Sequence, residues 1–289
     1  QACHNSCADS TGSAGDEDDF SVQCLFWHGL IHKEFIAYMQ YTQPASLPYP
    51  DEISASHCAR VGDHIRRVIR EAGGQISFAE FMHEALYAPG LGYYSAGSSK
   101  FGSDGDFITA PEISSVFGRV LARQCAEILH DIENAEVLEI GAGSGKLALD
   151  MLTMFEQMDA LPAAYNIFEV SADLVERQQR RLRDELPHLA DRIHWLSNLP
   201  LEFDGVIVAN EVLDALPVER FVRRDSSIAQ LCVSVSGENF VWTETQAPDR
   251  LAAFVATIEA DIGRTLEAGY TSEAALAAPL WIADLARCL

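Results

Sequence analysis

The feature that most constrains the fold is the stretch 137–147, which reads VLEIGAGSGKL. A short apolar run leads into three alternating glycines, and then into a segment in which apolar residues recur at helical spacing. This pattern predicts a buried strand, a tight loop and a helix. Glycine tolerates positive φ and has no Cβ to block a ligand, and the first turn of a helix has unpaired N–H groups. We therefore expect a small ligand at this loop.

The spacing of the glycines narrows the class of ligand. The dinucleotide fingerprint G-x-G-x-x-G would require glycine at the position of Lys146. The phosphate-binding loop G-x-x-x-x-G-K-[ST] would require glycine and a hydroxyl where Ile140 and Leu147 stand. The pattern that remains, E-x-G-x-G-x-G, resembles motif I of class I S-adenosylmethionine-dependent methyltransferases; the alternative is a glycine-rich turn without a ligand. By this resemblance the cofactor-binding residues are Glu139, Gly141, Ala142, Gly143 and Gly145.

Composition limits the partners and the compartment. The chain has 289 residues, of which 48% are hydrophobic, and a formal net charge of −23. This charge repels nucleic acid and anionic membranes and would attract a basic protein or peptide. The seven cysteines are odd in number and scattered, which favours reduced thiols. We expect a cytoplasmic protein, with the mitochondrial matrix as the alternative if a targeting segment precedes Gln1.

The N-terminal part divides into an extension and a helical region. Residues 1–52 begin with a polar, acidic stretch at 1–19, continue with an aromatic-rich segment at 20–41 that could form a short helix, and end in a proline-rich linker. This composition predicts a poorly ordered extension. Cysteines and histidines at its start match no standard zinc spacing, so we expect no metal there. In the region 53–130 we predict helices over 53–72, 78–88 and 116–129. Ser77 and Glu80 form a capping box for the second of these.

The region 131–289 alternates strands and helices, which predicts a Rossmann-like parallel sheet. Strands are expected at 137–140, 165–171, 192–196 and 204–210. Glu169, at the end of the second strand, is placed to bind a ribose diol. The resemblance to class I methyltransferases implies an adenine contact at Asn198 and Leu199, which follow the third strand. A β-meander insertion is expected at 218–245, followed by helices over 251–266 and 274–289.

Two acids follow the fourth strand, in the sequence Asn210-Glu211-x-x-Asp214. We expect Glu211 and Asp214 to project from adjacent helical turns beside the cofactor. There they could orient a guanidinium through charge-assisted hydrogen bonds, with Asn210 beside them. The alternative is that Glu211 only caps the following helix.

Several motifs in order resemble the MidA family of class I methyltransferases, relatives of a mitochondrial complex I assembly factor that symmetrically dimethylates arginine. They occupy residues 76–82, 87–94, 100–112, 139–145 and 210–218. In that family the loop corresponding to 101–109 folds over the cofactor as part of an N-terminal lid. The resemblance thus implies roles for Asp106, Phe107 and Thr109 in cofactor binding and for Phe101 and Gly102 in substrate binding. It also implies later sheet strands that this chain lacks, so we expect an incomplete sheet.

Together these patterns predict an α/β class I methyltransferase with an N-terminal helical lid and a β-meander insertion. The expected function is transfer of a methyl group from S-adenosyl-L-methionine to a protein nitrogen, with arginine implied by the resemblance. The alternatives are a non-catalytic assembly factor that binds the cofactor and clamps a partner protein, and a methyltransferase acting on small molecules.

Overall fold

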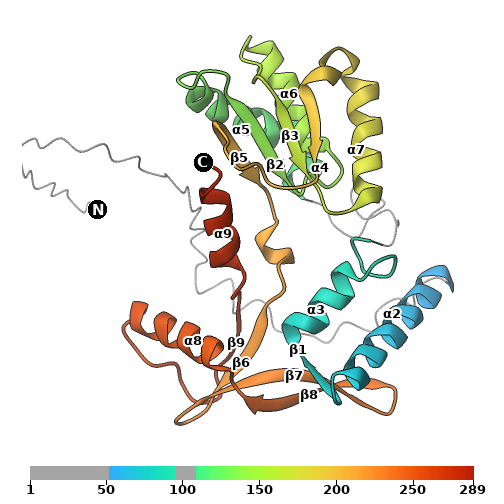
Figure 1. Cartoon of the computed structure of the whole chain (residues 1–289), viewed down its shortest axis with the longest axis vertical. Coiled ribbons are helices and arrows are strands. Elements are labelled where there is room, and N and C mark those ends of the chain that lie inside the picture. Colours follow the sequence, from blue (N-terminus) through green and yellow to red (C-terminus); the bar gives the residue numbers. More distant parts are fainter. Residues whose placement is uncertain (1–51, 96–108) are drawn as a thin grey trace, which may run out of the picture. The chain divides into compact units, whose positions relative to one another are not determined.

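The computed structural model describes residues 52–95 and 109–289 (Figure 1). All of these residues belong to one compact unit, Pro50–Leu289. Of the extension predicted at 1–52, residues 1–51 lie outside the described residues. Within the described residues, no helix combines the length and the hydropathy that a membrane span requires. No cluster of three or more potential metal ligands occurs within 52–95 and 109–289.

A four-stranded parallel sheet forms the centre of the part of the chain between residues 110 and 209. Its strands are β2 (Glu136–Ile140), β3 (Tyr165–Phe168), β4 (Ile193–Leu196) and β5 (Gly205–Ala209), in the order β4-β3-β2-β5. Each neighbouring pair is parallel. The strands are short and apolar, as expected for a sheet buried on both faces. All four strands predicted from the sequence are thereby confirmed, although the one expected over 165–171 ends at Phe168.

Helices cover both faces of this sheet. One face packs against α5 (Ser115–Leu129), α6 (Lys146–Gln157) and α7 (Ala172–Glu185), and Val137 and Tyr165 lie in that core. The alternate residues Leu138 and Ile140 pack on the other face, against Trp281 and Leu285 of α9 (Ala278–Ala286). Because strand side chains alternate in direction, β2 contributes to two separate cores.

A second, antiparallel sheet joins the N-terminal region to the insertion. It comprises β1 (Gln75–Ser77), β6 (Glu219–Arg223), β7 (Ile228–Ser236), β8 (Asn239–Gln246) and β9 (Thr271–Ala274). Its order is β1-β7-β6-β9, and β8 pairs with β7 as a hairpin. The helices α2 (Glu52–Glu71) and α3 (Phe78–Tyr87) pack on β1 and β7, and α8 (Asp249–Asp261) packs on β6 and β9.

The Ser77 half of the expected capping box is confirmed, because the Ser77 side chain accepts a hydrogen bond of 3.1 Å from the Glu80 backbone N–H. The two helices predicted near the C-terminus are present, but one bound of each was predicted wrongly. The helix expected over 251–266 ends at Asp261, close to Gly263 with its φ of 67°. The helix expected over 274–289 begins only at Ala278, with a proline in its first turn, since residues 271–274 form strand β9.

Gly118 lets α5 and α6 approach closely. A Cβ at Gly118 would lie 2.7 Å from the Cβ of Asp150 and 3.3 Å from Cδ1 of Leu147. We expect Gly118→Ala to lower the free energy of unfolding by roughly 1–3 kcal/mol, because the two helices must move apart. The control is Gly62→Ala on α2, where a Cβ would meet only the flexible end of Arg66. That change should raise stability by up to about 1 kcal/mol, and urea unfolding of both variants tests the contrast.

Candidate active site

The register of the parallel sheet brings the ends of three strands together. Ile140 of β2 pairs with Phe168 of β3 on one side and Ala209 of β5 on the other, so the segments that follow these strands start side by side. A cavity of about 750 Å³ opens at this edge, within the range of small-molecule sites. Nine predicted site residues line it, namely Thr109, Glu139, Gly141, Ala142, Gly143, Glu169, Asn210, Glu211 and Asp214.

The glycine loop has the expected conformation. Gly141, Gly143 and Gly145 have φ values of 67°, 54° and 76°, which side chains disfavour. Gly145 is the N-cap of α6, so the first N–H groups of this helix follow the loop directly. Gly145 itself lies outside the cavity lining; a Cβ there would come within 3.3 Å of Cγ of Gln178 on α7. The third glycine therefore serves the packing of the loop on a helix.

Glu139 is a buried acid at the end of β2. Its side chain is almost fully enclosed, and Oε2 accepts a hydrogen bond of 2.7 Å from the Tyr165 hydroxyl. Burial raises the pKa of Glu139 from 4.5 to about 7, the Tyr165 hydrogen bond opposes this, and the nearby charge of Glu169 adds to it. The carboxyl thus changes its charge near neutral pH, at the wall of the cavity.

The raised pKa of Glu139 predicts a pH-dependent stability. The contribution of the Glu139 carboxyl to the free energy of unfolding is fully present below pH 4.5. It is lost as the pH rises through about 7, because the folded state then holds a buried charge. The difference between the two pKa values corresponds to about 3 kcal/mol. Between pH 5 and pH 8, we expect Glu139→Gln to gain stability relative to the parent by a comparable amount.

Urea unfolding of both proteins at the two pH values measures this difference. Glu169, whose pKa burial also raises, is present in both proteins, so its own titration largely cancels. A stability difference that does not change with pH would show that the Glu139 pKa is not raised.

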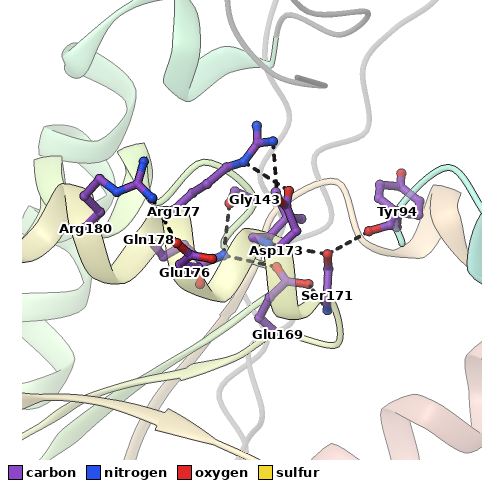
Figure 2. A network of polar contacts seen from close by, with 10 residues as sticks. Tyr94, Gly143, Glu169, Ser171, Asp173, Glu176, Arg177, Gln178 and Arg180 are labelled. Atoms are coloured by element: carbon purple, nitrogen blue, oxygen red, sulfur yellow. Dashed lines mark hydrogen bonds and ion pairs between the residues drawn. The ribbon is translucent and has the colours of Figure 1, made fainter. Parts of the chain in front are cut away.

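Glu169 stands just beyond the end of β3, in a network shown in Figure 2. Its carboxylate accepts hydrogen bonds from the backbone N–H of Ser171 at 3.0 Å and from Nε2 of Gln178 at 3.2 Å. Burial raises the pKa of Glu169, and these hydrogen bonds act in the opposite direction. The Ser171 hydroxyl caps α7 and donates to the Tyr94 carbonyl at 2.7 Å, which ties the segment after α3 to this strand end.

The acids after β5 do not project from adjacent helical turns, so that prediction is wrong. Glu211 has a φ of 51°, in the left-handed region. Only a single 3₁₀ turn, η2 (Leu213–Ala215), follows, and its N-cap is Val212 without a side-chain cap. The alternative that Glu211 caps a helix is therefore also wrong. Glu211 and Asp214 are both exposed and both border the cavity.

The structure adds aromatic residues that the sequence reasoning did not assign to the site. His83, Tyr87 and Tyr94 line the same cavity as the glycine loop. The rings of Tyr87 and Tyr94 stack at 5.5 Å, and the Tyr87 hydroxyl donates to the Ala215 carbonyl at 2.7 Å. Burial, then the nearby Tyr94, Asp214 and Glu169, raise the pKa of Tyr87 to about 12. The tyrosines of the 87–94 motif are the sequence feature that could have indicated these aromatic site residues.

A second link joins α4 (Ala110–Ile113) to the glycine loop. The Ser144 hydroxyl donates to Glu112, and Arg181 of α7 donates to the same Ser144 oxygen at 2.9 Å. Glu112 and Ser144 both line the cavity, and Thr109 is the N-cap of α4. These contacts place the start of the segment after residue 108 at the site.

Besides Gly145, six predicted residues are not brought to the cavity by the described part of the chain. Asn198 is exposed, and Leu199 packs into the core beneath α9 rather than into the cavity. The remaining four, Phe101, Gly102, Asp106 and Phe107, lie outside the described residues. Their roles, and the adenine contact, stay predictions.

The comparisons with known proteins agree with this fold. Residues 120–289 match a protein family described as S-adenosyl-L-methionine-dependent methyltransferase. A crystal structure of a methyl transferase from Burkholderia thailandensis, bound to S-adenosyl-homocysteine, is 36% identical with a TM-score of 0.76, covering 83% of this chain and 62% of that one. A native structure from the same organism gives 35% and 0.72, with coverages of 83% and 61%.

Curated relatives carry a more specific name. "Protein arginine methyltransferase NDUFAF7, mitochondrial" from Danio rerio is 32% identical over 193 residues, which is 58% of this chain and 45% of the relative. The protein of that name from Bos taurus is 31% identical, over 56% and 42% of the two chains. The chain spans about half the length of the curated relatives it matches. By the family match and the class I methyltransferase fold, the chain belongs to the MidA-like family of S-adenosyl-L-methionine-dependent methyltransferases.

Proposed function

We propose that this chain binds S-adenosyl-L-methionine in the 750 Å³ cavity and takes part in methyl transfer to a protein nitrogen, with arginine as the acceptor. The proposal rests on one observation, which is that residues suited to the cofactor and residues suited to a cationic acceptor line the same cavity. A glycine loop, the buried Glu139 and the half-buried Glu169 line one part of the cavity, and two exposed acids, Glu211 and Asp214, border the same space.

The residues present fit the chemistry of the cofactor. Glu169, held by hydrogen bonds at the end of β3, can accept from a ribose diol. The loop around Gly141 and Gly143 leaves room for the methionine part, and Glu139 can balance its ammonium group. When bound, the cofactor supplies a methyl group on a positively charged sulfur.

The acceptor side depends on charge and orientation. Carboxylates at Glu211 and Asp214 can bind a guanidinium through charge-assisted hydrogen bonds and hold one nitrogen toward the methyl group. They also offset the positive charge on the acceptor while the new bond forms. The stacked Tyr87 and Tyr94 offer aromatic faces to a planar cation at the same cavity. The names of the curated relatives support arginine as the acceptor.

The same names favour a mitochondrial location for this chain over the cytoplasmic one expected from its composition. We therefore propose the mitochondrial matrix. The net charge of −23 still favours a basic protein or peptide as the partner.

The proposal is tested with the purified chain, first by calorimetric titration with S-adenosyl-L-homocysteine. The chain is then incubated with isotopically labelled S-adenosyl-L-methionine and a panel of arginine peptides. Peptides with lysine in place of arginine serve as controls. We expect binding, and label that mass spectrometry locates on arginine only. A folded chain that does not bind the cofactor product would overturn the proposal.

Two other results would redirect the assignment. Binding of the cofactor without transfer to any peptide, together with retention of a basic protein partner, would favour the non-catalytic assembly factor. Transfer to free amines but not to peptides would favour a methyltransferase of small molecules.

A further inference from the structure

Gln178 is a buried polar residue that contacts the site from outside the cavity and has no assigned role in the proposed function. It lies on α7, its side chain is fully enclosed, and it is not part of the cavity lining. Burying an amide is costly unless its hydrogen bonds are made. The partners of Gln178 therefore indicate what this residue is for.

All three partners of the Gln178 amide belong to different elements. Nε2 donates to the Gly143 carbonyl at 2.9 Å and to Oε2 of Glu169 at 3.2 Å, as Figure 2 shows. Oε1 accepts a hydrogen bond of 3.0 Å from the indole N–H of Trp195 on β4. The amide thus connects the glycine loop, the end of β3 and the neighbouring strand.

The chemistry of these partners requires an amide in one orientation. A carbonyl and a carboxylate both need a donor, and the two N–H groups of one amide nitrogen serve both. The indole of Trp195 can only donate, so it fixes which end of the amide carries the oxygen. A carboxylate at position 178 could not donate to Glu169, and an aliphatic side chain would leave both acceptors without this donor.

We infer that Gln178 is a positioning residue for the cofactor, holding the Glu169 carboxylate and the Gly143 carbonyl in a fixed relation before the cofactor binds. The inference rests on the proposed function. Glu169 and Gly143 both line the cavity, whereas Gln178 stands behind them and acts through them. Preorganising the acid that meets the ribose lowers the cost of ordering it on binding.

The test compares Gln178→Leu with Gln179→Leu, the same change at the next position of α7 and outside the cavity lining. Each protein is titrated by calorimetry with S-adenosyl-L-homocysteine and with its 2′,3′-dideoxy analogue, which lacks the ribose diol. We expect Gln178→Leu to weaken binding of the natural compound about tenfold and the dideoxy compound much less. Gln179→Leu should leave both affinities unchanged. This dependence on the diol is a readout that a merely structural role would not give.

The outcomes separate the two proposals. If the parent does not bind S-adenosyl-L-homocysteine, the proposed function fails and this inference with it. If the parent binds, and Gln178→Leu binds equally well or loses the same factor for both compounds, the inference fails while the proposed function stands.

A second variant covers the case in which Gln178→Leu does not fold, as judged by circular dichroism. Trp195→Phe removes the hydrogen bond to Oε1 and keeps an aromatic ring. It should release the amide orientation and weaken binding of the natural compound about threefold, with a smaller loss for the dideoxy analogue. An unchanged affinity in this variant would overturn the inference.

Discussion

Replacing Gly141 with valine is expected to reduce the affinity for S-adenosyl-L-homocysteine by more than about 100-fold. Gly141 has a φ of 67°, and a Cβ there would lie 3.0 Å from Cγ2 of Val212, which lines the same cavity. A branched side chain both strains this backbone and fills space next to the glycine loop. Calorimetric titration of the folded variant measures the effect.

The control separates backbone strain from loss of the site. Gly237, in the turn between β7 and β8, has a nearly equal φ of 62°, and a Cβ there would have no atom within 4 Å. Gly237→Val should therefore lower stability by roughly 1–2 kcal/mol and leave the affinity unchanged. Equal affinities for Gly141→Val and the parent would remove the glycine loop from the proposed cofactor site.

The parallel sheet was predictable because its signals are local. Each strand is a short apolar run, and the glycines after Ile140 mark the change from strand to helix within a few residues. The order of parallel strands then fixes which chain ends meet, so Glu139, Glu169 and Asn210 could be placed at one edge before any coordinates.

The antiparallel sheet was predictable only in part, because two of its strands depend on distant partners. β1 has three residues and pairs with β7 more than 150 positions later, for example through Gln75 and Ser234. β9 reads TSEA, with one buried residue, Ala274, and forms where β6 provides an edge. Neither segment is long or apolar enough to indicate a strand by itself.

The same distinction applies to the site. Residues that follow a strand were found from their position, whereas Tyr87 and Gln178 reach the site from helices packed against it. Helical periodicity predicts only that Gln178 lies on the apolar face of its helix. Nothing in the neighbouring sequence indicates that its amide faces Gly143. For Glu211 the residue was predicted correctly as lining the site, but its left-handed backbone conformation was not predicted.

Removing the two acids that border the cavity should separate catalysis from cofactor binding. In Glu211→Gln/Asp214→Asn the shapes are kept and two negative charges are lost. If these acids hold a guanidinium, each charge-assisted hydrogen bond contributes on the order of 1.5–3 kcal/mol. We expect kcat/KM for an arginine peptide to fall by about 100-fold or more. The affinity for S-adenosyl-L-homocysteine, which carries no sulfonium charge, should change less than about twofold.

The matched control is Glu202→Gln/Asp204→Asn, which removes the same two charges from exposed positions before β5, outside the cavity lining. It should keep both the rate and the affinity, because the charge lost there is separated from the cavity and screened by solvent. A fall in cofactor affinity in the Glu211/Asp214 variant, with an unchanged rate at saturating cofactor, would assign the two acids to the cofactor instead. If both double variants lose rate by the same factor, the overall negative charge attracts the basic peptide. No specific contact at Glu211 or Asp214 would then orient the acceptor.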